Sequence, residues 1–380
     1  MKYTLIADNV FDGEQFLGSV PVNVQDGIVL ALDGESRFAE RRLPGTLVPG
    51  FVDVQVNGGG GVLFNADTSR SGIELIGQAH SQFGTTAFLP TLITDDVTVM
   101  MAAADAVAEA IACGSAGVVG VHFEGPHLSV PKKGVHPQSH IRRISDAELA
   151  IFARQDLGVK VVTLAPENVS AEVIRALTQS GVKVCLGHTN ADYDTVVAAI
   201  EAGACGFTHL YNAMSALGSR EPGVVGAAID DERTWCGLIV DGHHVHRAAA
   251  RIAIKAKPRG KMMLVTDAMP PVGMAHGESF ELFGTQVVRQ GDRLNAVTGE
   301  LAGCVLDMAT AVRNTVTQLG IPLAEALRMA SLYPSQFLGM DSHLGRIAAG
   351  YRADFALLDA QLVNQTSFIR GEAVYQRTLG

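Results

Sequence analysis

Four residues that could bind a metal ion or transfer a proton each stand at the end of a short apolar run. These residues are Glu124 in "GVVGVHFE", His188 after "VKVCLG", His209 after "GFT" and Asp267 after "KMMLVT". Imidazole nitrogens and carboxylate oxygens suit zinc or another borderline divalent ion, and three protein ligands leave one position for water. A lone histidine after a strand is more often a hydrogen-bonded core residue, so the alternative is a purely structural polar cluster.

The apolar runs alternate with alanine-rich segments that have helical periodicity. Examples of the helical segments are "DDVTVMMAAADAVAEAIACG" and "ADYDTVVAAIEAGA". This alternation is typical of parallel strands joined by crossover helices. The eight runs are "GFVDVQVNG", "TTAFLPTLIT", "GVVGVHFEGP", "VKVVTLAPE", "VKVCLGHTN", "GFTHLYNAM", "WCGLIVDGHHV" and "KMMLVTDAM". They predict an α/β fold, a (β/α)8 TIM-like barrel over residues 49–344. A doubly wound sheet would also alternate, but it usually has fewer strands and often a G-x-G-x-x-G fingerprint, which this sequence lacks.

In such a barrel the active site lies at the carboxyl ends of the strands, so residues that end different runs should meet. In "VDVQVNG", Asp53, Gln55 and Asn57 share one face of the first run. Glu167 ends the fourth run and His244 the seventh. We expect Gln55, Asn57 and these strand-end residues to line one shared pocket with the four residues named first.

The two ends of the chain have a different pattern. Residues 1–48 and 345–380 contain alternating strands with D-G turns, such as "VNVQDGIVLALDG". We expect the two ends to fold together as a small β-sandwich domain beside the catalytic barrel.

Composition limits the class of partner. The chain has 380 residues, 18% of them charged, and a net charge of −10, which argues against a general nucleic-acid or membrane-surface binder. No apolar run approaches the roughly 20 residues needed to span a bilayer, so the expectation is a cytoplasmic protein with a small-molecule partner. The five cysteines are widely spaced and include no C-x-x-C pair, which indicates reduced, mostly buried thiols.

Motifs in the same order over nearly the whole chain carry a family resemblance. They are "PGFVDVQVNGGGG", "HFEGPHL", "KKGVH", "TLAPE", "GHTNA", "THLYNAM", "REPG", "DGHHV", "VTDAM" and the terminal "LGRIAAGYRADF". The sequence resembles the N-acetylglucosamine-6-phosphate deacetylases of the amidohydrolase superfamily. The resemblance implies hydrolysis of N-acetyl-D-glucosamine 6-phosphate to D-glucosamine 6-phosphate and acetate, an activity of amino sugar metabolism.

The resemblance also implies catalytic roles. Glu124, His188 and His209 would bind one divalent metal, most simply Zn²⁺, although Fe²⁺, Co²⁺ and Mn²⁺ suit the same ligands. The metal would lower the pKa of its water, and Asp267 would act as general base and then return the proton to the departing amine. His136, in "KKGVH", would stabilise the substrate carbonyl as it becomes an oxyanion.

Substrate contacts are expected from four further positions. Asn212 and the backbone N–H of Ala213, in "THLYNAM", and Arg220, in "REPG", suit a phosphate. His244 occupies the D-G-x-H-V position and would contact the sugar or the phosphate. The resemblance implies a homodimer in which Arg220 or His244 could act in the neighbouring subunit's site.

Two departures qualify the resemblance. Many amidohydrolases have H-x-H on the first strand and bind a second metal there, whereas this chain has Gln55 and Asn57. An amide is a poor substitute for imidazole, so we predict a single metal with Gln55 close to it as an outer contact. Cys304, in "LAGCVLDM", stands where relatives commonly have serine.

Three alternatives remain from the sequence. The same reaction on N-acetylgalactosamine 6-phosphate differs only in epimer choice, which depends on pocket shape. A cyclic-amide or deaminating amidohydrolase has no obvious use for "NAM" and "REPG". A non-catalytic sugar-phosphate sensor would need neither Asp267 nor the metal ligands.

Overall fold

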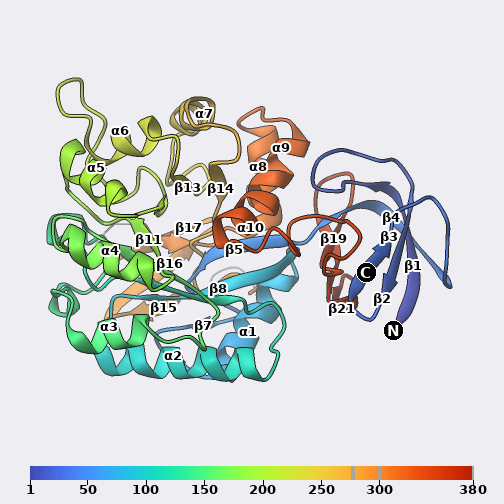
Figure 1. Ribbon diagram of the computed structural model, residues 1–380, viewed down its shortest axis with the longest axis horizontal. Helices are drawn as coiled ribbons and strands as arrows, with labels where there is room; N and C mark the ends of the chain where they lie inside the picture. The colour runs from blue at the N-terminus through green and yellow to red at the C-terminus, as the bar shows by residue number, and fades with distance from the viewer. Residues whose placement is uncertain (275–278, 298, 300, 379–380) are drawn as a thin grey trace.

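Eight parallel strands form a nearly closed barrel at the centre of the molecule (Figure 1). The computed structural model describes residues 1–274, 279–297, 299 and 301–378. The barrel strands, in chain order, are β5 (Phe51–Val56), β8 (Thr85–Ile93), β9 (Gly120–Glu124), β10 (Val159–Leu164), β11 (Lys183–Leu186), β12 (Gly206–Phe207), β13 (Trp235–Leu238) and β14 (Met262–Leu264). Each strand pairs with the next in sequence, and each comes from one of the eight predicted runs. The predicted barrel is therefore confirmed.

The first and last strands close the barrel through residues just beyond β14. Val56 and Ala268 form a parallel bridge, and the Asp267 N–H donates to the Gln55 carbonyl at 3.0 Å. The Asn57 N–H donates to the Ala268 carbonyl at 2.9 Å. This seam brings the polar face of β5 against the strand end that carries Asp267.

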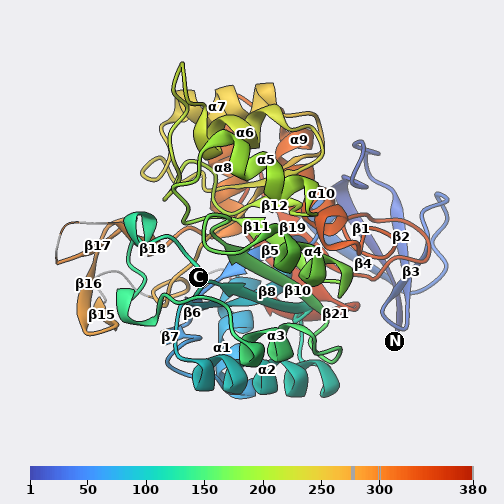
Figure 2. The same ribbon diagram turned by 60° about the vertical axis from the view of Figure 1, so that its left-hand side comes forward.

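Helices surround the strands, as Figures 1 and 2 show. They are α1 (Arg70–Ser81), α2 (Val97–Ala112), α3 (Asp146–Phe152), α4 (Ala171–Gln179), α5 (Tyr193–Glu201), α6 (Gly223–Asp230), α7 (Arg247–Ala256), α8 (Met308–Thr317), α9 (Leu323–Ala330) and α10 (Leu332–Leu338). The two alanine-rich segments quoted above form α2 and α5, which begin after the capping residues Asp96 and Asp192. Among the described residues, no helix is long and apolar enough to cross a membrane.

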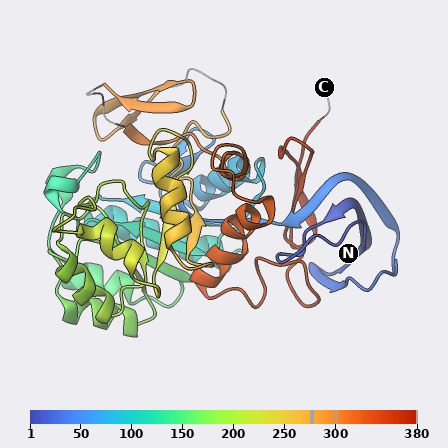
Figure 3. The same ribbon diagram turned by 90° about the horizontal axis from the view of Figure 1, so that it is seen from above.

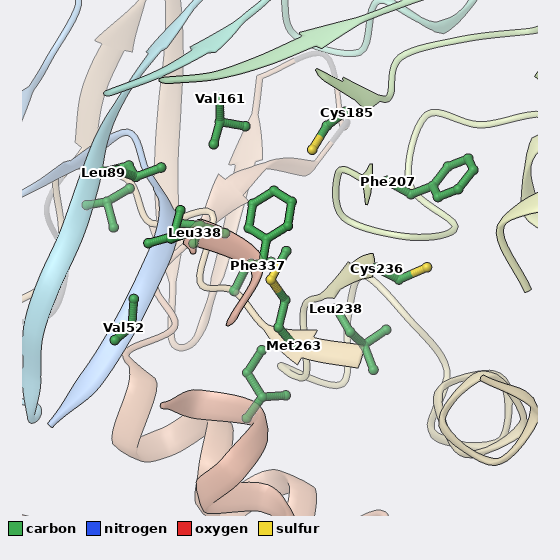
Figure 4. Close-up of a cluster of buried hydrophobic side chains, with 14 of the residues drawn as sticks. Val52, Leu89, Val161, Cys185, Phe207, Cys236, Leu238, Met263, Phe337 and Leu338 are labelled. Atoms are coloured by element: carbon green, nitrogen blue, oxygen red, sulfur yellow. The ribbon is translucent and has the colours of Figure 1, made fainter. Parts of the chain in front are cut away.

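Apolar side chains fill the barrel interior below the strand ends. Phe337, from α10, lies among side chains of several barrel strands, including Val161 and Met263 (Figure 4). All three residues are buried. Such packing fixes the strands whose carboxyl ends carry the polar residues of the site.

Both chain ends contribute to a second unit beside the barrel (Figure 1). Its strands form one seven-stranded sheet in the order β21 (Glu372–Gln376), β20 (Asn364–Ile369), β19 (Phe355–Leu358), β4 (Glu40–Pro49), β1 (Lys2–Val10), β2 (Pro21–Gln25) and β3 (Ile28–Ala31). The expectation that the ends fold together is confirmed, with the strands hydrogen-bonded into a single sheet. The sheet has its own apolar core, and the Tyr3 hydroxyl of β1 donates to the carbonyl of Gly371, between β20 and β21.

A four-stranded antiparallel sheet between β14 and α8 was not predicted from the sequence. Its strands are β15 (Ser279–Leu282), β16 (Thr285–Gln290), β17 (Arg293–Ala296) and β18 (Leu301–Cys304). It projects from the barrel in Figures 2 and 3. Its apolar residues, including Leu282 and Val287, cluster with Ile93 and Met269 of the barrel. The insert therefore covers part of the barrel mouth.

Three short elements complete the chain. The hairpin β6 (Gly58–Gly59) and β7 (Val62–Leu63) follows β5, and two 3₁₀ helices, η1 (Val130–Lys132) and η2 (Gln138–His140), flank His136.

The five cysteines are free: Cys185, Cys236 and Cys304 are buried, Cys205 is half-buried and Cys113 is exposed. The predicted reduced and mostly buried thiols agree with this distribution.

Candidate active site

The polar strand ends meet in one pocket at the mouth of the barrel. The pocket has a volume of about 180 Å³. Its lining residues are Asn57, Ile93, Glu124, Gly134, Val135, His136, His188, His209, Asn212, Ala213, His244, Asp267, Met269, Leu301 and Gly303. Most of the predicted site residues are in this set, so the expectation of a shared pocket holds for them.

Glu124, His188 and His209 bring three ligand atoms together. Oε1 of Glu124 lies 3.2 Å from Nε2 of His188 and 2.9 Å from Nε2 of His209, and the two Nε2 atoms are 3.0 Å apart. All three side chains are buried. Ligands around a tetrahedral zinc ion at ~2.0–2.1 Å are roughly 3.3 Å apart, so these spacings suit one divalent ion.

The hydrogen bonds of His188 support the same interpretation. Nδ1 of His188 lies 2.9 Å from the carbonyl oxygen of Lys132, so Nδ1 carries the proton and Nε2 presents a lone pair. That lone pair faces the Glu124 carboxylate. Two electron-rich groups in contact inside a protein need a cation between them, and a neutral imidazole held by a backbone carbonyl is the usual form of a metal ligand. The three residues therefore fit a divalent metal.

Asp267 is held at the pocket by two amide side chains, one in β5 and one directly after it. Nδ2 of Asn57 donates to Asp267 Oδ1 at 2.7 Å, and Nε2 of Gln55 donates to the same oxygen at 3.0 Å. Gln55 Nε2 also lies 3.2 Å from both carboxylate oxygens of Glu124. The amides thus connect the two carboxylates and occupy the face of the site where a second metal's imidazole ligands could otherwise stand.

The two carboxyl groups have opposite pKa shifts. Burial raises the pKa of Asp267, and the negative charge of Glu124 raises it further. Burial acts in the same direction on Glu124, but the adjacent His188 and His209 rings lower its pKa well below the usual range. Glu124 is therefore the ionised ligand, whereas Asp267 has a greater tendency to accept a proton than an ordinary aspartate.

The backbone is strained where the site residues turn into the pocket. His188, His209, Ala213 and Asp267 all have positive φ angles, of 48°, 33°, 51° and 52°. Non-glycine residues rarely adopt this conformation, and each such residue costs of order 1–3 kcal/mol. The surrounding strands hold these turns in place, and the turns direct the side chains and the Ala213 N–H into the pocket.

His136 reaches the pocket from the loop between η1 and η2. It is buried, contrary to the solvated position that a histidine after two lysines often has. Its Nδ1 lies 2.8 Å from the Thr94 hydroxyl and accepts from the Thr94 N–H at 3.4 Å, which leaves the ring proton on Nε2. Burial and the neighbouring His188 lower the pKa of His136 well below 6.5, so the ring is neutral. It can donate one hydrogen bond without carrying charge.

Asn212 and His244 complete the pocket on the side of β12 and β13. Nδ2 of Asn212 donates to the His209 carbonyl at 3.2 Å. Nδ1 of His244 lies 2.6 Å from Oδ2 of Asp241. Both residues line the pocket, as predicted.

Three predicted residues do not line this pocket, and the first, Gln55, instead contacts Glu124 and Asp267. Arg220 is exposed in the turn between β12 and α6 and is absent from the lining. Glu167 was expected in the shared pocket, which is wrong: it is exposed, and its carboxylate accepts from the Thr189 hydroxyl and the Asn190 N–H outside the lining. Because a strand end has two faces, the position after β10 did not determine which way the side chain points.

Two other residues were missed. Asp241 orients His244, and Thr94 orients His136. Asp241 ends an apolar run in the quoted motif "DGHHV", so the rule that found Glu124 could have found it. Thr94 ends the second quoted run, "TTAFLPTLIT", so the same rule could have found it as well.

Comparisons with known proteins agree with this geometry. Residues 46–375 match the model of the Amidohydrolase family, and the chain belongs to this family. Its relatives include an N-acetylgalactosamine-6-phosphate deacetylase of Shewanella sp. (strain ANA-3), 52% identical over 93% of this chain and 91% of the relative. An N-acetylglucosamine-6-phosphate deacetylase of Bos taurus is 40% identical over 87% of this chain and 83% of its own length. The solved structure of N-acetylglucosamine-6-phosphate deacetylase from Pasteurella multocida superposes with a TM-score of 0.94, at 35% identity, covering 98% of this chain and 99% of that one.

Proposed function

We propose that this protein hydrolyses the N-acetyl group of an amino-sugar 6-phosphate, releasing acetate and the free amine. The observation that carries the proposal is the convergence of Glu124, His188 and His209 with Asp267 in one buried pocket. The names of the relatives reported above support the choice of substrate class. A deaminating amidohydrolase or a sugar-phosphate sensor has no comparable support.

Glu124, His188 and His209 would hold one divalent ion, for which zinc is our first choice. When bound, such an ion makes hydroxide available near neutral pH and polarises the substrate carbonyl. The amide side chains of Gln55 and Asn57, both engaged with Asp267, support one ion rather than two.

Asp267 would take a proton from the attacking water and return it to the nitrogen of the departing amine. Its raised pKa suits both transfers, since a general base works best when its pKa approaches the operating pH. His136 would donate its Nε2–H to the carbonyl oxygen as negative charge develops there. A neutral donor of this kind stabilises the oxyanion without competing for the proton that Asp267 handles.

The phosphate group needs donors at the other side of the pocket. Asn212, the Ala213 N–H and His244 line that side, but no lysine or arginine is among the lining residues. We propose that the protein is a homodimer and that Arg220, exposed here, enters the pocket of the neighbouring subunit. Arginine is suited to phosphate because its guanidinium can form two parallel hydrogen bonds.

Two epimers are possible substrates. The sequence motifs led us to N-acetyl-D-glucosamine 6-phosphate, which would yield D-glucosamine 6-phosphate. The 52% identity to an enzyme named for N-acetylgalactosamine 6-phosphate favours the other epimer as a second candidate. The two sugars differ in one hydroxyl configuration, so the same catalytic groups would serve both.

The test is acetate release by the metal-loaded protein from both 6-phosphates and from unphosphorylated N-acetylglucosamine. We expect release from at least one phosphorylated sugar, with a higher kcat/KM than for the unphosphorylated one. The ratio of kcat/KM between the two 6-phosphates assigns the epimer. Absence of release from every sugar, with metal bound, would refute the proposed substrate class.

A further inference from the structure

A buried group of three side chains lies at the edge of the pocket, and only His244 among them has a role in the proposed function. It consists of Asp241, after β13, His244, three residues later, and Cys304, the last residue of β18. The side chains of Asp241 and His244 are 6% and 8% exposed, and Cys304 is 1% exposed. The group joins the barrel to the inserted sheet next to Asp267, because the Cys304 N–H donates to the Asp267 carbonyl at 3.1 Å.

The Asp241 carboxylate receives four hydrogen bonds. Oδ1 accepts from the backbone N–H groups of His243 and His244, at 2.8 and 2.9 Å. Oδ2 accepts from Nδ1 of His244 at 2.6 Å and from the Cys304 thiol at 3.2 Å. Asp241 therefore fixes both the turn on which His244 stands and the orientation of its ring.

These contacts describe a hydrogen-bonded pair better than a second metal site. Two ligands of one zinc ion are separated by roughly 3.3 Å, whereas Nδ1 of His244 and Oδ2 of Asp241 are only 2.6 Å apart. Burial alone would raise the pKa of Asp241, but the hydrogen bonds from His244 and from the backbone N–H groups reverse this and lower it. Burial also raises the pKa of the Cys304 thiol well above its usual value, so the thiol remains a donor.

Fixing Nδ1 determines what His244 offers to the pocket. Nε2 of His244 has no hydrogen-bond partner among the described residues, and the residue lines the pocket beside Asn212 and Ala213. With Nδ1 bonded to Asp241, only Nε2 of the His244 ring remains available to a substrate, and its position is fixed. No lysine or arginine is among the described residues that line the pocket.

We propose that Asp241 is a positioning residue for substrate phosphate: it holds His244 so that Nε2 binds the phosphate, and the Cys304 thiol locks the carboxylate in place. The proposal rests on the proposed function, since it assigns a phosphorylated substrate to the pocket. It adds two residues, Asp241 and Cys304, that determine phosphate selectivity without touching the reacting atoms.

The test compares kinetic constants of D241N with those of the wild type, on the 6-phosphate that the wild type prefers. An asparagine can keep one acceptor oxygen but loses the charge. We expect KM to rise by about 10-fold or more while kcat changes by less than about 3-fold, because a ground-state contact is lost. The ratio of kcat/KM for the phosphorylated sugar to that for the unphosphorylated sugar should fall. A wild-type KM in folded D241N would overturn the proposal.

The matched control is D292N. Asp292 Oδ1 lies 2.9 Å from Nε2 of His243, the neighbouring histidine, and its side chain is 78% exposed. The same Asp→Asn change there should leave KM unaltered. An equal rise in KM in D292N would show a general charge effect and would also overturn the proposal.

Cys304 provides a second, milder pair of variants. C304S keeps a hydroxyl that can donate to Asp241, whereas C304A removes the donor. We expect C304A to raise KM by several-fold and C304S to retain most of the affinity that C304A loses. Equal KM values in C304A and the wild type would remove Cys304 from the proposal.

A measurement without substrate separates this inference from the proposed function. In ¹⁵N-labelled protein, His244 Nδ1 should give the signal of a protonated, strongly hydrogen-bonded nitrogen, and D241N should lose that signal. If the wild type hydrolyses no amino-sugar phosphate but shows this signal, the positioning pair is supported and the substrate class fails. Two bound metal ions in the wild type and one in D241N would instead identify a metal site and overturn the inference.

Discussion

Asn57, directly after the first barrel strand, donates from Nδ2 to Oδ1 of Asp267, beyond the last strand, at 2.7 Å. The backbones of the same two segments also close the barrel, through the Asn57 N–H and the Ala268 carbonyl. The position of Asp267 is therefore coupled to barrel closure. A polar face on a buried strand, which would be unfavourable in an ordinary core, is explained by this contact.

Removing the Asn57 amide should change the pH dependence of the reaction. The hydrogen bond from Asn57 lowers the pKa of Asp267, so N57A should raise that pKa further. A general base acts only when ionised, so activity falls when the pH drops below the pKa of Asp267. In N57A this fall should occur at a higher pH than in the wild type. We also expect kcat to fall by about 10-fold, since the carboxylate is less well oriented. The check is the pH profile of kcat/KM for both proteins, and an acid limb that stays in place would contradict the assignment.

Metal content should follow the Glu124, His188 and His209 cluster. We expect one equivalent of divalent metal per chain in active protein, and near-complete loss in E124Q, which removes the only negative ligand. E124D, with a shorter carboxylate, is the matched control and should keep partial occupancy. Elemental analysis after gel filtration measures both. Two ions per chain, both required for turnover, would refute the single-metal assignment.

Much of the fold followed from periodicity alone. Helices cover the outer face of the eight barrel strands, and apolar side chains pack against the inner face. Each strand is therefore a near-continuous apolar run, which is easy to recognise in a sequence. Glu124, His188, His209 and Asp267 could be chosen because each interrupts such a run at the carboxyl end, where barrels place their active sites.

Other features depend on contacts that no local pattern records. The strands β15 to β18 are short, and their apolar residues pack against Leu63 and Ile93, which are distant in sequence, as well as against Met269. Glu167 satisfies the same strand-end rule as Glu124 but turns outward to Thr189 and Asn190. The sequence marks the ends of strands, whereas the direction of a side chain after the strand depends on the turn that follows.

Buried His80 should make the protein less stable below neutral pH. Its Nε2 lies 2.9 Å from the Gly58 carbonyl, and burial lowers the pKa of its ring from 6.5 to about 4. The folded protein therefore keeps His80 neutral, while the unfolded chain binds a proton below pH 6.5. This difference in pKa contributes roughly 3 kcal/mol to the free energy of unfolding. The contribution is complete above pH 6.5 and is lost as pH falls towards 4.

H80Q tests this, because glutamine can still donate to the Gly58 carbonyl but does not titrate. We expect the free energy of unfolding of the wild type to fall relative to that of H80Q as pH is lowered from 7.5 to 4.5. Urea titrations of both proteins at several pH values measure the difference. A difference that is independent of pH would show that His80 titrates equally in the folded and unfolded states.

Arg220 allows the proposed dimer to be tested through activity. The residue is exposed and absent from the pocket of its own chain, and the lining there has no lysine or arginine. We expect R220A to raise KM for the phosphorylated sugar by about 10-fold or more, because a charge-assisted contact to phosphate is lost.

We expect D267N to abolish most turnover while keeping metal, since the general base contributes about 10²–10⁴-fold.

The two variants should restore each other only if Arg220 acts across the dimer. In a mixed dimer, the R220A chain keeps Asp267 and would receive Arg220 from its partner, so one intact site forms. Random exchange makes half of the dimers mixed, and activity at low substrate should recover to about a quarter of wild type. If Arg220 serves its own chain, neither site in the mixed dimer is intact and mixing restores nothing. Unfolding and refolding the two variants together, with each variant refolded alone as the control, distinguishes these arrangements.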